Sequence, residues 1–255
     1  MTDKNNIANN KKAWEYSVYE WRMMHQGKPE ELARKICENP NMYLRYHADL
    51  FLHIKDKTIA SICGSDGQRA VALALKGAHA TVFDLSENQK TYALELAKAA
   101  LVEINYEVGD FCCLDEHKYK SFFDYAYCEG GILHYFLDLN LFFETVSKIL
   151  KPNGTFICSD YHPFQKTIIA NPKKRNVDQC DGNYFDRNIH VGHVPYAKYF
   201  SDDRAFPSCT LRFYTLSEIF SSAINAGLSI EGFREHPKFD GGKVPFEFTL
   251  ILKKI

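Results

Sequence analysis

The feature that most constrains the fold is an apolar run, a turn with two glycines, a helix-favouring segment and a second apolar run ending in aspartate. Residues 58–63 form the first run, Gly64-Ser65-Asp66-Gly67 follows, and residues 68–76 are rich in alanine and leucine. Residues 79–84 form the second run, which ends at Asp84. This order predicts strand, tight turn, helix and strand. Two strands joined by a helix pair in parallel through a right-handed crossover.

The same alternation continues to residue 160. Ser86 lies three residues before Gln89, a capping-box spacing that predicts a helix continuing to residue 100. Strands are predicted at residues 104–108, 122–128 and 155–160, and a helix at residues 139–150. Repeated units of this kind build an α/β fold with a parallel sheet and helices on both faces.

The last segments follow a different pattern. A helix is predicted at residues 216–226, followed by strands at residues 228–236 and 246–252. No helix fits between these two strands, so we expect them to pair antiparallel as a hairpin at the sheet edge.

Two segments lie outside the alternating core. Residues 1–57 are predicted to form a helical cap, with Trp14, Val18 and Trp21 on one face of one helix and Leu32 and Ile36 on another. Residues 161–214 are loop-like, rich in aromatic residues and too long for a simple connection, so we interpret them as a substrate lid. The lid interrupts a core domain of residues 58–255.

Charge and composition exclude several classes of partner. The formal net charge is -1, from 31 basic and 32 acidic residues, so no broad field attracts nucleic acid or an anionic membrane surface. The first residues lack the apolar core of a signal peptide, and no long apolar stretch predicts a membrane span. We therefore expect a cytoplasmic protein, and the sequence leaves its oligomeric state open.

The glycine turn and the strand-end aspartate predict a site for a nucleoside-containing cofactor. In such sheets the ligand lies beyond the carboxyl ends of the strands, where glycines allow close approach and an acid accepts from ribose hydroxyls. Gly64, Gly67 and Asp84 fit this pattern, and the interval from Gly67 to Asp84 is close to the usual roughly 20 residues. A tight strand-to-helix connection without a ligand is the alternative.

The turn also discriminates between cofactors. A dinucleotide requires G-x-G-x-x-G to hold its pyrophosphate, and that motif is absent. Asp66 would repel a pyrophosphate but can bond the ammonium group of S-adenosylmethionine, which carries no phosphate. S-adenosylmethionine is therefore the cofactor that these residues favour.

The chain resembles the class I S-adenosylmethionine-dependent methyltransferases through IASICGSDGQRAVALALKGAHATVFDLS, the later VGDF and LKPNGTFICSD. It is most similar to the bacterial small-molecule type, in which N-terminal helices and an insertion cover the site. The resemblance implies a Rossmann-like, doubly wound sheet of seven strands in the order 3-2-1-4-5-7-6, with strand 7 antiparallel.

The resemblance also assigns cofactor-binding residues. Gly64, Ser65, Asp66 and Gly67 would form the cofactor turn, although Cys63 and Ser65 stand where the family's G-x-G-x-G turn has its first two glycines. The other contacts implied are with ribose, adenine and the path of the transferred methyl group. In that order they are Asp84 for the ribose, Leu85, Asp110 and Phe111 for the adenine, and Cys128, Glu129 and Gly130 for the methyl path.

Methyl transfer from a sulfonium requires an aligned nucleophile and, for some acceptors, a base. The candidate catalytic residues follow the fourth and fifth core strands, where groups of this architecture act. They are Glu129 and His134 after one strand, and Asp160, Tyr161 and His162 after the other. Each has an alternative role in capping or packing. S-adenosylhomocysteine would be the product.

Several observations favour a small-molecule acceptor, with oxygen or nitrogen as the nucleophile. The Asn/Asp-Pro-Pro-Tyr segment of amino-group methyltransferases is replaced by Cys128-Glu129-Gly130-Gly131. Aromatic residues of the lid either enclose an apolar substrate or pack as a small core. These are Tyr184, Phe185, Tyr196, Tyr199 and Phe200.

Two further groups of residues were considered for a role at the site. Trp14, Tyr16, Tyr19, Trp21 and Arg45 either reach the site or dock the N-terminal helices, and helical spacing favours docking. His190 and His193 lack partners that would complete a ligand set, so we predict no metal site.

Two other functions remain open from the sequence. The first alternative to a methyltransferase is a non-catalytic protein that binds S-adenosylmethionine or another nucleoside. The second is a nicotinamide-dependent oxidoreductase. The missing pyrophosphate motif and the edge hairpin argue against the oxidoreductase.

Overall fold

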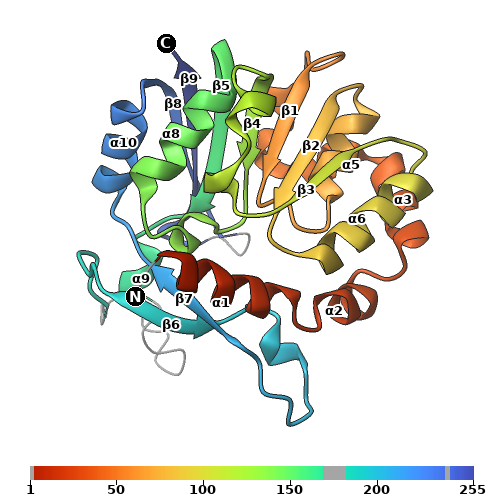
Figure 1. Cartoon of the computed structure of the whole chain (residues 1–255), viewed down its shortest axis with the longest axis horizontal. Helices are drawn as coiled ribbons and strands as arrows, with labels where there is room; N and C mark the ends of the chain where they lie inside the picture. The colour runs from red at the N-terminus through yellow and green to blue at the C-terminus, as the bar shows by residue number, and fades with distance from the viewer. Residues whose placement is uncertain (1–2, 169–181, 239–241) are drawn as a thin grey trace.

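A computed structural model describes residues 3–168, 182–238 and 242–255 of the chain. Its centre is a seven-stranded sheet in the order β3-β2-β1-β4-β5-β9-β8 (Figure 1). The strands of this sheet are β1 (Thr58–Ile62), β2 (His79–Asp84), β3 (Asn105–Val108), β4 (Phe123–Cys128), β5 (Leu150–Tyr161), β8 (Leu228–Pro237) and β9 (Pro245–Lys254).

The strand order and directions confirm the predicted topology. The first five strands pair in parallel, with Ile59 opposite Ala80 and also opposite Tyr125. β9 pairs antiparallel with both β5 and β8, so the C-terminal hairpin closes one edge of the sheet. In chain order within this sheet, β9 is the seventh strand, and it is the one that runs antiparallel.

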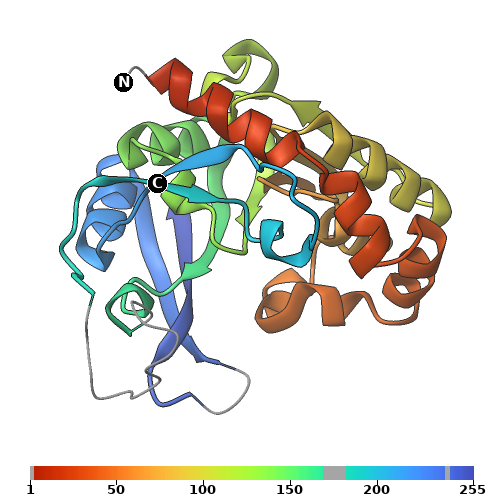
Figure 2. The same ribbon diagram turned by 90° about the horizontal axis from the view of Figure 1, so that it is seen from below.

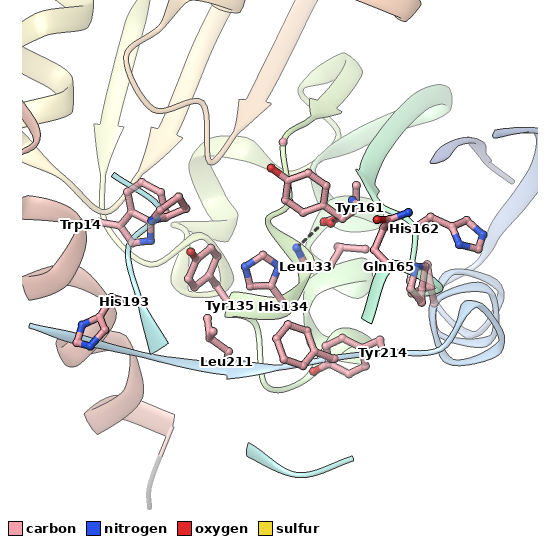
Figure 3. A pocket seen from close by; sticks show the side chains of 17 residues that line it. Trp14, Leu133, His134, Tyr135, Tyr161, His162, Gln165, His193, Leu211 and Tyr214 are labelled. Atoms are coloured by element: carbon pink, nitrogen blue, oxygen red, sulfur yellow. Dashed lines mark hydrogen bonds between the residues drawn. The ribbon is translucent and has the colours of Figure 1, made fainter. Parts of the chain in front are cut away.

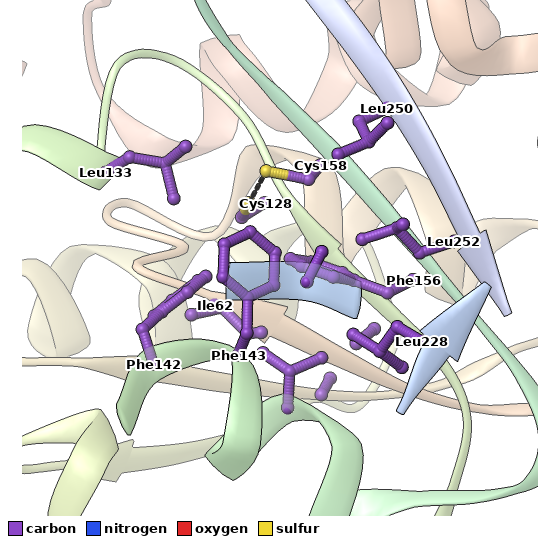
Figure 4. Close-up of a cluster of buried hydrophobic side chains, with 14 of the residues drawn as sticks. Ile62, Cys128, Leu133, Phe142, Phe143, Phe156, Cys158, Leu228, Leu250 and Leu252 are labelled. Atoms are coloured by element: carbon purple, nitrogen blue, oxygen red, sulfur yellow. Dashed lines mark hydrogen bonds between the residues drawn. The ribbon is translucent and has the colours of Figure 1, made fainter. Parts of the chain in front are cut away.

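Helices cover both faces of the sheet, as the alternation predicts. On one face lie α5 (Gln68–Leu75) and α6 (Glu87–Ala99), with α3 (Pro29–Glu38) packed against both. On the other lie α8 (Leu139–Ile149) and α10 (Leu216–Asn225), over a core that includes Phe142 and Phe156 (Figure 4). Alternate residues of each strand enter the two cores, because successive side chains point to opposite faces.

The helix starts follow local rules that the sequence shows. The hydroxyl of Ser86 accepts from the Gln89 amide at 3.1 Å, as the spacing predicts for α6. Thr215 and Glu218 form a complete capping box at the start of α10. These side chains satisfy amide groups that the first helical turn leaves without partners.

The N-terminal region differs from the prediction of one continuous helix bearing Trp14, Val18 and Trp21. It forms α1 (Asp3–Glu15) and α2 (Val18–His25), which separate at Ser17, where φ is 55°. The Tyr196 hydroxyl donates to the Tyr16 carbonyl at 2.8 Å and lies 3.0 Å from the Ala13 carbonyl. This distant tyrosine binds carbonyl oxygens at the end of α1, where the helix leaves them free. After α3 come two further short helices, which are α4 (Pro40–Leu44) and η1 (Arg45–Phe51).

The segment 161–214 contains more regular structure than its sequence suggests. Besides α9 (Gln165–Ile168) and η4 (Ala197–Tyr199), it contains β6 (Ile189–His193) and β7 (Ser208–Arg212), which pair antiparallel as a separate two-stranded sheet. Two shorter 3-10 turns in the core chain, η2 (Phe111–Cys113) and η3 (Leu133–Tyr135), and the short helix α7 (Glu116–Tyr119) complete the described elements. Part of the predicted lid, residues 169–181, lies outside the described residues.

The added elements gather on one side of the molecule. α1 and the β6–β7 sheet lie across the carboxyl ends of the parallel strands, and the view from below shows them crossing in front of the core (Figures 1 and 2). α1 also contacts β7 directly. Among the described residues, no helix is both long and apolar enough to span a membrane.

Candidate active site

The turn between β1 and α5 requires both of its glycines. A Cβ atom at Gly64 would lie 2.6 Å from the Ser61 hydroxyl, and one at Gly67 would lie 2.8 Å from the Ala93 Cβ. Gly67 also has a φ of +74°, a left-handed conformation that glycine adopts without strain. These glycines let the turn pack closely against β1, β2 and α6. Ser65, which stands at one of the family's glycine positions, has a φ of 52°.

Asp84 at the end of β2 holds this turn in place. One carboxylate oxygen accepts from the Ser65 amide at 3.0 Å and the other from the Ser86 amide at 3.1 Å. Burial raises the pKa of Asp84 to about 6, although these amide donors act in the opposite direction. A carboxylate has about four acceptor positions, so the two amide bonds leave capacity for ligand hydroxyls.

Arg22 of α2 reaches the same turn and was missed by the sequence reasoning. Its guanidinium lies 2.7 Å from the buried carboxylate of Asp66 and donates to the Ser65 hydroxyl at 2.6 Å. It also donates to Gln89 of α6 at 3.2 Å. The ion pair places a positive and a negative group beside the turn, which matches the carboxylate and ammonium groups of an amino acid. The one available signal was the spacing of Arg22 four residues after Val18, on the inward face of α2.

Space for a ligand exists at the end of β4. A Cβ atom at Gly130, where φ is +102°, would meet no atom within 4 Å. At Gly131 it would collide with the ring of Tyr161. The open side of Gly130, the strand-end Asp84 and the charged turn together fit S-adenosylmethionine.

The remaining residues assigned to the cofactor occupy the strand ends in different ways. Asp110 caps η2 by accepting from the Cys112 amide at 3.0 Å, and Leu85 is half-buried after β2. Phe111 is buried against Phe83 and Phe142, with ring centroids 5.8 and 5.7 Å away. Cys128 is buried with its sulfur 3.5 Å from that of Cys158. Their contacts with a cofactor remain predictions.

Glu129 is the centre of a buried ion-pair cluster. It pairs with Arg45 of η1 at 2.6 Å and with Arg69 of α5, and Arg45 also pairs with Glu247 of β9 at 3.1 Å. Burial alone would raise the pKa of Glu129, but the two guanidinium groups lower it to about 2. A carboxylate with so low a pKa is a weak proton acceptor near neutral pH. Arg45, for which the sequence left open a place at the site or a role in docking, contacts the carboxylate of Glu129 at the end of β4.

A cavity of about 250 Å³ opens beyond the ends of β4 and β5 and is bordered by β7 (Figure 3). Four of the candidate catalytic residues, His134, Asp160, Tyr161 and His162, line it, and Gly130 and Gly131 do so as well. The structure thus brings together residues from both strand ends. The other lining residues come from the same strand ends, from α1 and from the segments that follow β5, namely Trp14, Leu133, Tyr135, Pro163, Gln165, His193, Pro195, Leu211, Phe213, Tyr214 and Ile219.

The N-terminal aromatic residues divide between cavity and packing. Trp14 lines the cavity, and its ring centroid lies 5.6 Å from that of Tyr135. The helical spacing in the sequence had instead favoured a role in docking the N-terminal helices. Trp21 stacks on Tyr196 with centroids 5.3 Å apart, and Tyr19 donates to Glu95 at 2.6 Å. Tyr16 packs on Phe206, so these three dock the N-terminal helices.

The five aromatic residues of the lid that the sequence offered as a substrate enclosure are not among the residues that line the cavity. Tyr196 is buried under α1 and α2, and Phe200 packs on Phe206 with ring centroids 5.3 Å apart. Phe185 is 73% exposed and Tyr199 53% exposed. The Tyr184 hydroxyl accepts from the Leu216 amide at 3.1 Å, at the start of α10. His190 lies 3.0 Å from Asp186, and His193 lines the cavity.

Asp160 fixes the loop that carries His134. Its buried carboxylate accepts from the amides of Ile132 and Leu133 at 2.8 and 2.7 Å, and from the Tyr161 amide at 2.6 Å. Burial raises the pKa of Asp160 to about 6, although the three amides lower it. Asp160 therefore positions the loop between β4 and η3.

We expect the Asp160→Asn variant to show a changed dependence of stability on pH. The pKa of Asp160 in the folded chain, about 6, lies above the ordinary value of 3.8, so the folded state holds the proton more tightly. This contribution to stability is present below about pH 4 and is lost as pH rises through 6. Lowering the pH from 7 to 4 should therefore stabilise the wild type relative to the variant by about 2 kcal/mol. Urea unfolding of both proteins at both pH values measures the difference, and parallel pH profiles would contradict it.

Comparisons with known proteins agree with the fold. A family model described as a methyltransferase domain matches residues 62–158. Phosphoethanolamine N-methyltransferase 1 of Arabidopsis thaliana is 34% identical over 108 residues, which cover 42% of this chain and 21% of that protein. The chain thus matches about a fifth of the length of this curated relative.

Solved structures extend the similarity beyond the matched domain. A putative S-adenosylmethionine-dependent methyltransferase from Listeria monocytogenes has a TM-score of 0.62 at 18% identity, covering 79% of this chain and 92% of that one. Magnesium protoporphyrin IX methyltransferase from Synechocystis PCC 6803, solved with bound SAH, has a TM-score of 0.60 at 11% identity, covering 98% and 100%. Together with the domain match, they confirm the resemblance to class I S-adenosylmethionine-dependent methyltransferases.

Proposed function

We propose that this chain, which carries a methyltransferase domain on the class I fold, transfers a methyl group from S-adenosylmethionine to a small molecule. The observation that carries the proposal is the position of Gly130 and Gly131. These residues follow β4 beside the region predicted for the cofactor, and they also line the cavity. Cofactor and acceptor would therefore meet at the end of β4, as transfer by in-line displacement requires.

Residues of the turn and of β2 would hold the cofactor. Asp84 would accept from the ribose hydroxyls, while Asp66 and Arg22 would bond the amino-acid part. Asp110, Leu85 and Phe111 would contact or support the adenine, and Cys128 with Gly130 would border the methyl path. The bound cofactor supplies an activated methyl group on a sulfonium, so the chain has to orient the acceptor, exclude water and manage a proton.

Two of the histidines that line the cavity, His134 and His162, would have different tasks. The Nδ1 atom of His162 accepts from the Phe164 amide at 3.1 Å, so a neutral ring carries its proton on Nε2, which lies 3.2 Å from Glu235. Burial lowers the pKa of His162, although Glu235 acts in the opposite direction, and this favours the neutral ring. His162 would therefore serve as a fixed, neutral part of the cavity wall. His134 would take the proton of the acceptor, with Tyr161 closing the wall beside Gly131.

Glu129 would act by positioning. Its ion pairs connect β4 with η1, α5 and β9, so they hold the strand end on which both sites depend. The low pKa of Glu129 argues against proton acceptance.

Calorimetric titration of the full chain with S-adenosylmethionine, S-adenosylhomocysteine and NAD tests the cofactor. We expect micromolar binding of the first two and none of NAD, and binding of NAD alone would refute the proposal. Release of S-adenosylhomocysteine over a library of small metabolites then distinguishes an enzyme from a sensor. Tight binding without turnover of any compound would favour the non-catalytic alternative.

A further inference from the structure

We infer that the methyl acceptor is a small organic amine with an apolar body and without a phosphate or carboxylate group. This inference rests on the proposed function, because it concerns the acceptor cavity of that same site. It specifies the nucleophile as nitrogen and the charge of the free substrate as positive.

Aromatic rings form much of the cavity wall. Trp14 of α1, Tyr135 of η3 and Tyr161 of β5 lie on one side, and Phe213 and Tyr214 follow β7 (Figure 3). The rings of Trp14 and Tyr135 meet edge to face at 5.6 Å. The faces of such rings carry negative potential, which attracts ammonium groups and repels anions.

The charged groups around the cavity also favour a substrate without negative charge. Of the described residues that line it, none is lysine or arginine, and the one carboxylate is that of Asp160. The guanidinium group of Arg212 lies over the ring of Tyr214 and is paired with Glu218 at 2.8 Å. Those of Arg45 and Arg69 are paired with Glu129. A phosphate or carboxylate placed here would lose its hydration without meeting a lysine or arginine among the described lining residues, which is unfavourable.

The cavity volume limits the body of the acceptor. At about 250 Å³ the cavity is smaller than the roughly 300–1,000 Å³ of sites for drug-sized ligands. A single ring or a short alkyl chain bearing the amine fits this space.

The transfer step balances for an amine. The ammonium form loses one proton to His134, and the nitrogen lone pair then forms the new N–C bond. The electron pair of the broken C–S bond stays on sulfur, which leaves in neutral S-adenosylhomocysteine. No oxidant or reductant is needed.

Three probes of similar size test the preference for positive charge. Benzylamine, benzyl alcohol and benzoate are titrated into the full chain saturated with S-adenosylhomocysteine at pH 7.5. We expect benzylamine to bind about tenfold more tightly than benzyl alcohol, the ratio that a cation–π interaction supports, and benzoate to bind most weakly. Phosphoethanolamine, which adds a phosphate to an amine, should bind more weakly than benzylamine.

The outcomes separate the two proposals. Failure of S-adenosylhomocysteine to bind in the first step refutes the proposed function. If it binds, then tighter binding of benzoate or phosphoethanolamine than of benzylamine overturns only the amine inference. Absence of binding by all four probes overturns it as well.

A matched pair of variants locates the effect. We expect Trp14→Leu to reduce the preference for benzylamine over benzyl alcohol about fivefold, because one aromatic face is lost. Trp21→Leu serves as the control, because Trp21 stacks on His25 and Tyr196 and is not among the lining residues. Equal preferences in both variants would exclude Trp14 from amine recognition, and the three-probe comparison in the wild type does not depend on either variant folding.

Discussion

Replacing Glu129 with Gln is expected to lower the free energy of unfolding by about 3–5 kcal/mol, the largest loss of stability among the changes considered. The Glu129 side chain is 1% exposed, and the guanidinium groups of Arg45 and Arg69 lie against it. Gln preserves the shape but removes the negative charge. Two partly buried cations would then face each other without their shared partner.

Urea unfolding measures this loss directly. Asp49→Asn is the control, because the Asp49–Arg234 pair is exposed to solvent and should leave the unfolding midpoint almost unchanged. A double-mutant cycle with Arg69→Met isolates the contact itself. We expect Glu129→Gln to cost less in the Arg69→Met background, because one of the two cations is already gone. Equal costs in both backgrounds would contradict the ion-pair account.

Replacing Asp84 with Asn is expected to weaken the binding of S-adenosylhomocysteine by about 10- to 150-fold. A hydrogen bond to a charged group contributes about 1.5–3 kcal/mol, and the amide of Asn cannot accept from ribose hydroxyls as the carboxylate does. Asn keeps one oxygen, which can still accept from the Ser65 amide that Asp84 holds at 3.0 Å. Asp84→Ala removes that support as well, so it should weaken binding further and also destabilise the turn.

Calorimetry on folded protein tests this prediction, and the chain offers a matched control. Asp124 is a strand carboxylate at the opposite end of the sheet, where it pairs with Lys151 at 2.8 Å. Asp124→Asn should leave the affinity for S-adenosylhomocysteine unchanged. If Asp84→Asn and Asp124→Asn bind equally well, Asp84 does not belong to the cofactor site.

Much of the core was predictable because its signals are local. The interval from β1 to β2, the Ser86 and Thr215 caps and the apolar runs of β4 and β5 each depend on neighbours in the sequence. The edge hairpin followed from the absence of a helix between two strands. The division into cap, core and lid stays a prediction.

The candidate site was predictable only in part. Asp84 and the glycine turn carry a spacing signal, and His134, Tyr161 and His162 were found from their positions after strands. The spacing of Arg22 indicates only that it lies on the inward face of α2, and it does not identify its partners Ser65 and Asp66, which lie in the turn before α5. The weak basicity of Glu129 likewise depends on Arg45 and Arg69, which only the fold brings to it.

The amino-acid sequence by itself determined the alternating α/β core and the edge at which functional groups gather, because helix and strand periodicities act over a few residues. The order of the strands was implied by the resemblance to a known family. Tertiary structure alone decided where α1 ends, since the hydroxyl of Tyr196 binds carbonyls about 180 residues away. It also decided that Trp14 joins Tyr135 at the cavity and that Asp160 holds the loop of His134. Such contacts join segments far apart in the chain, and burial and charge at each site depend on all of them together.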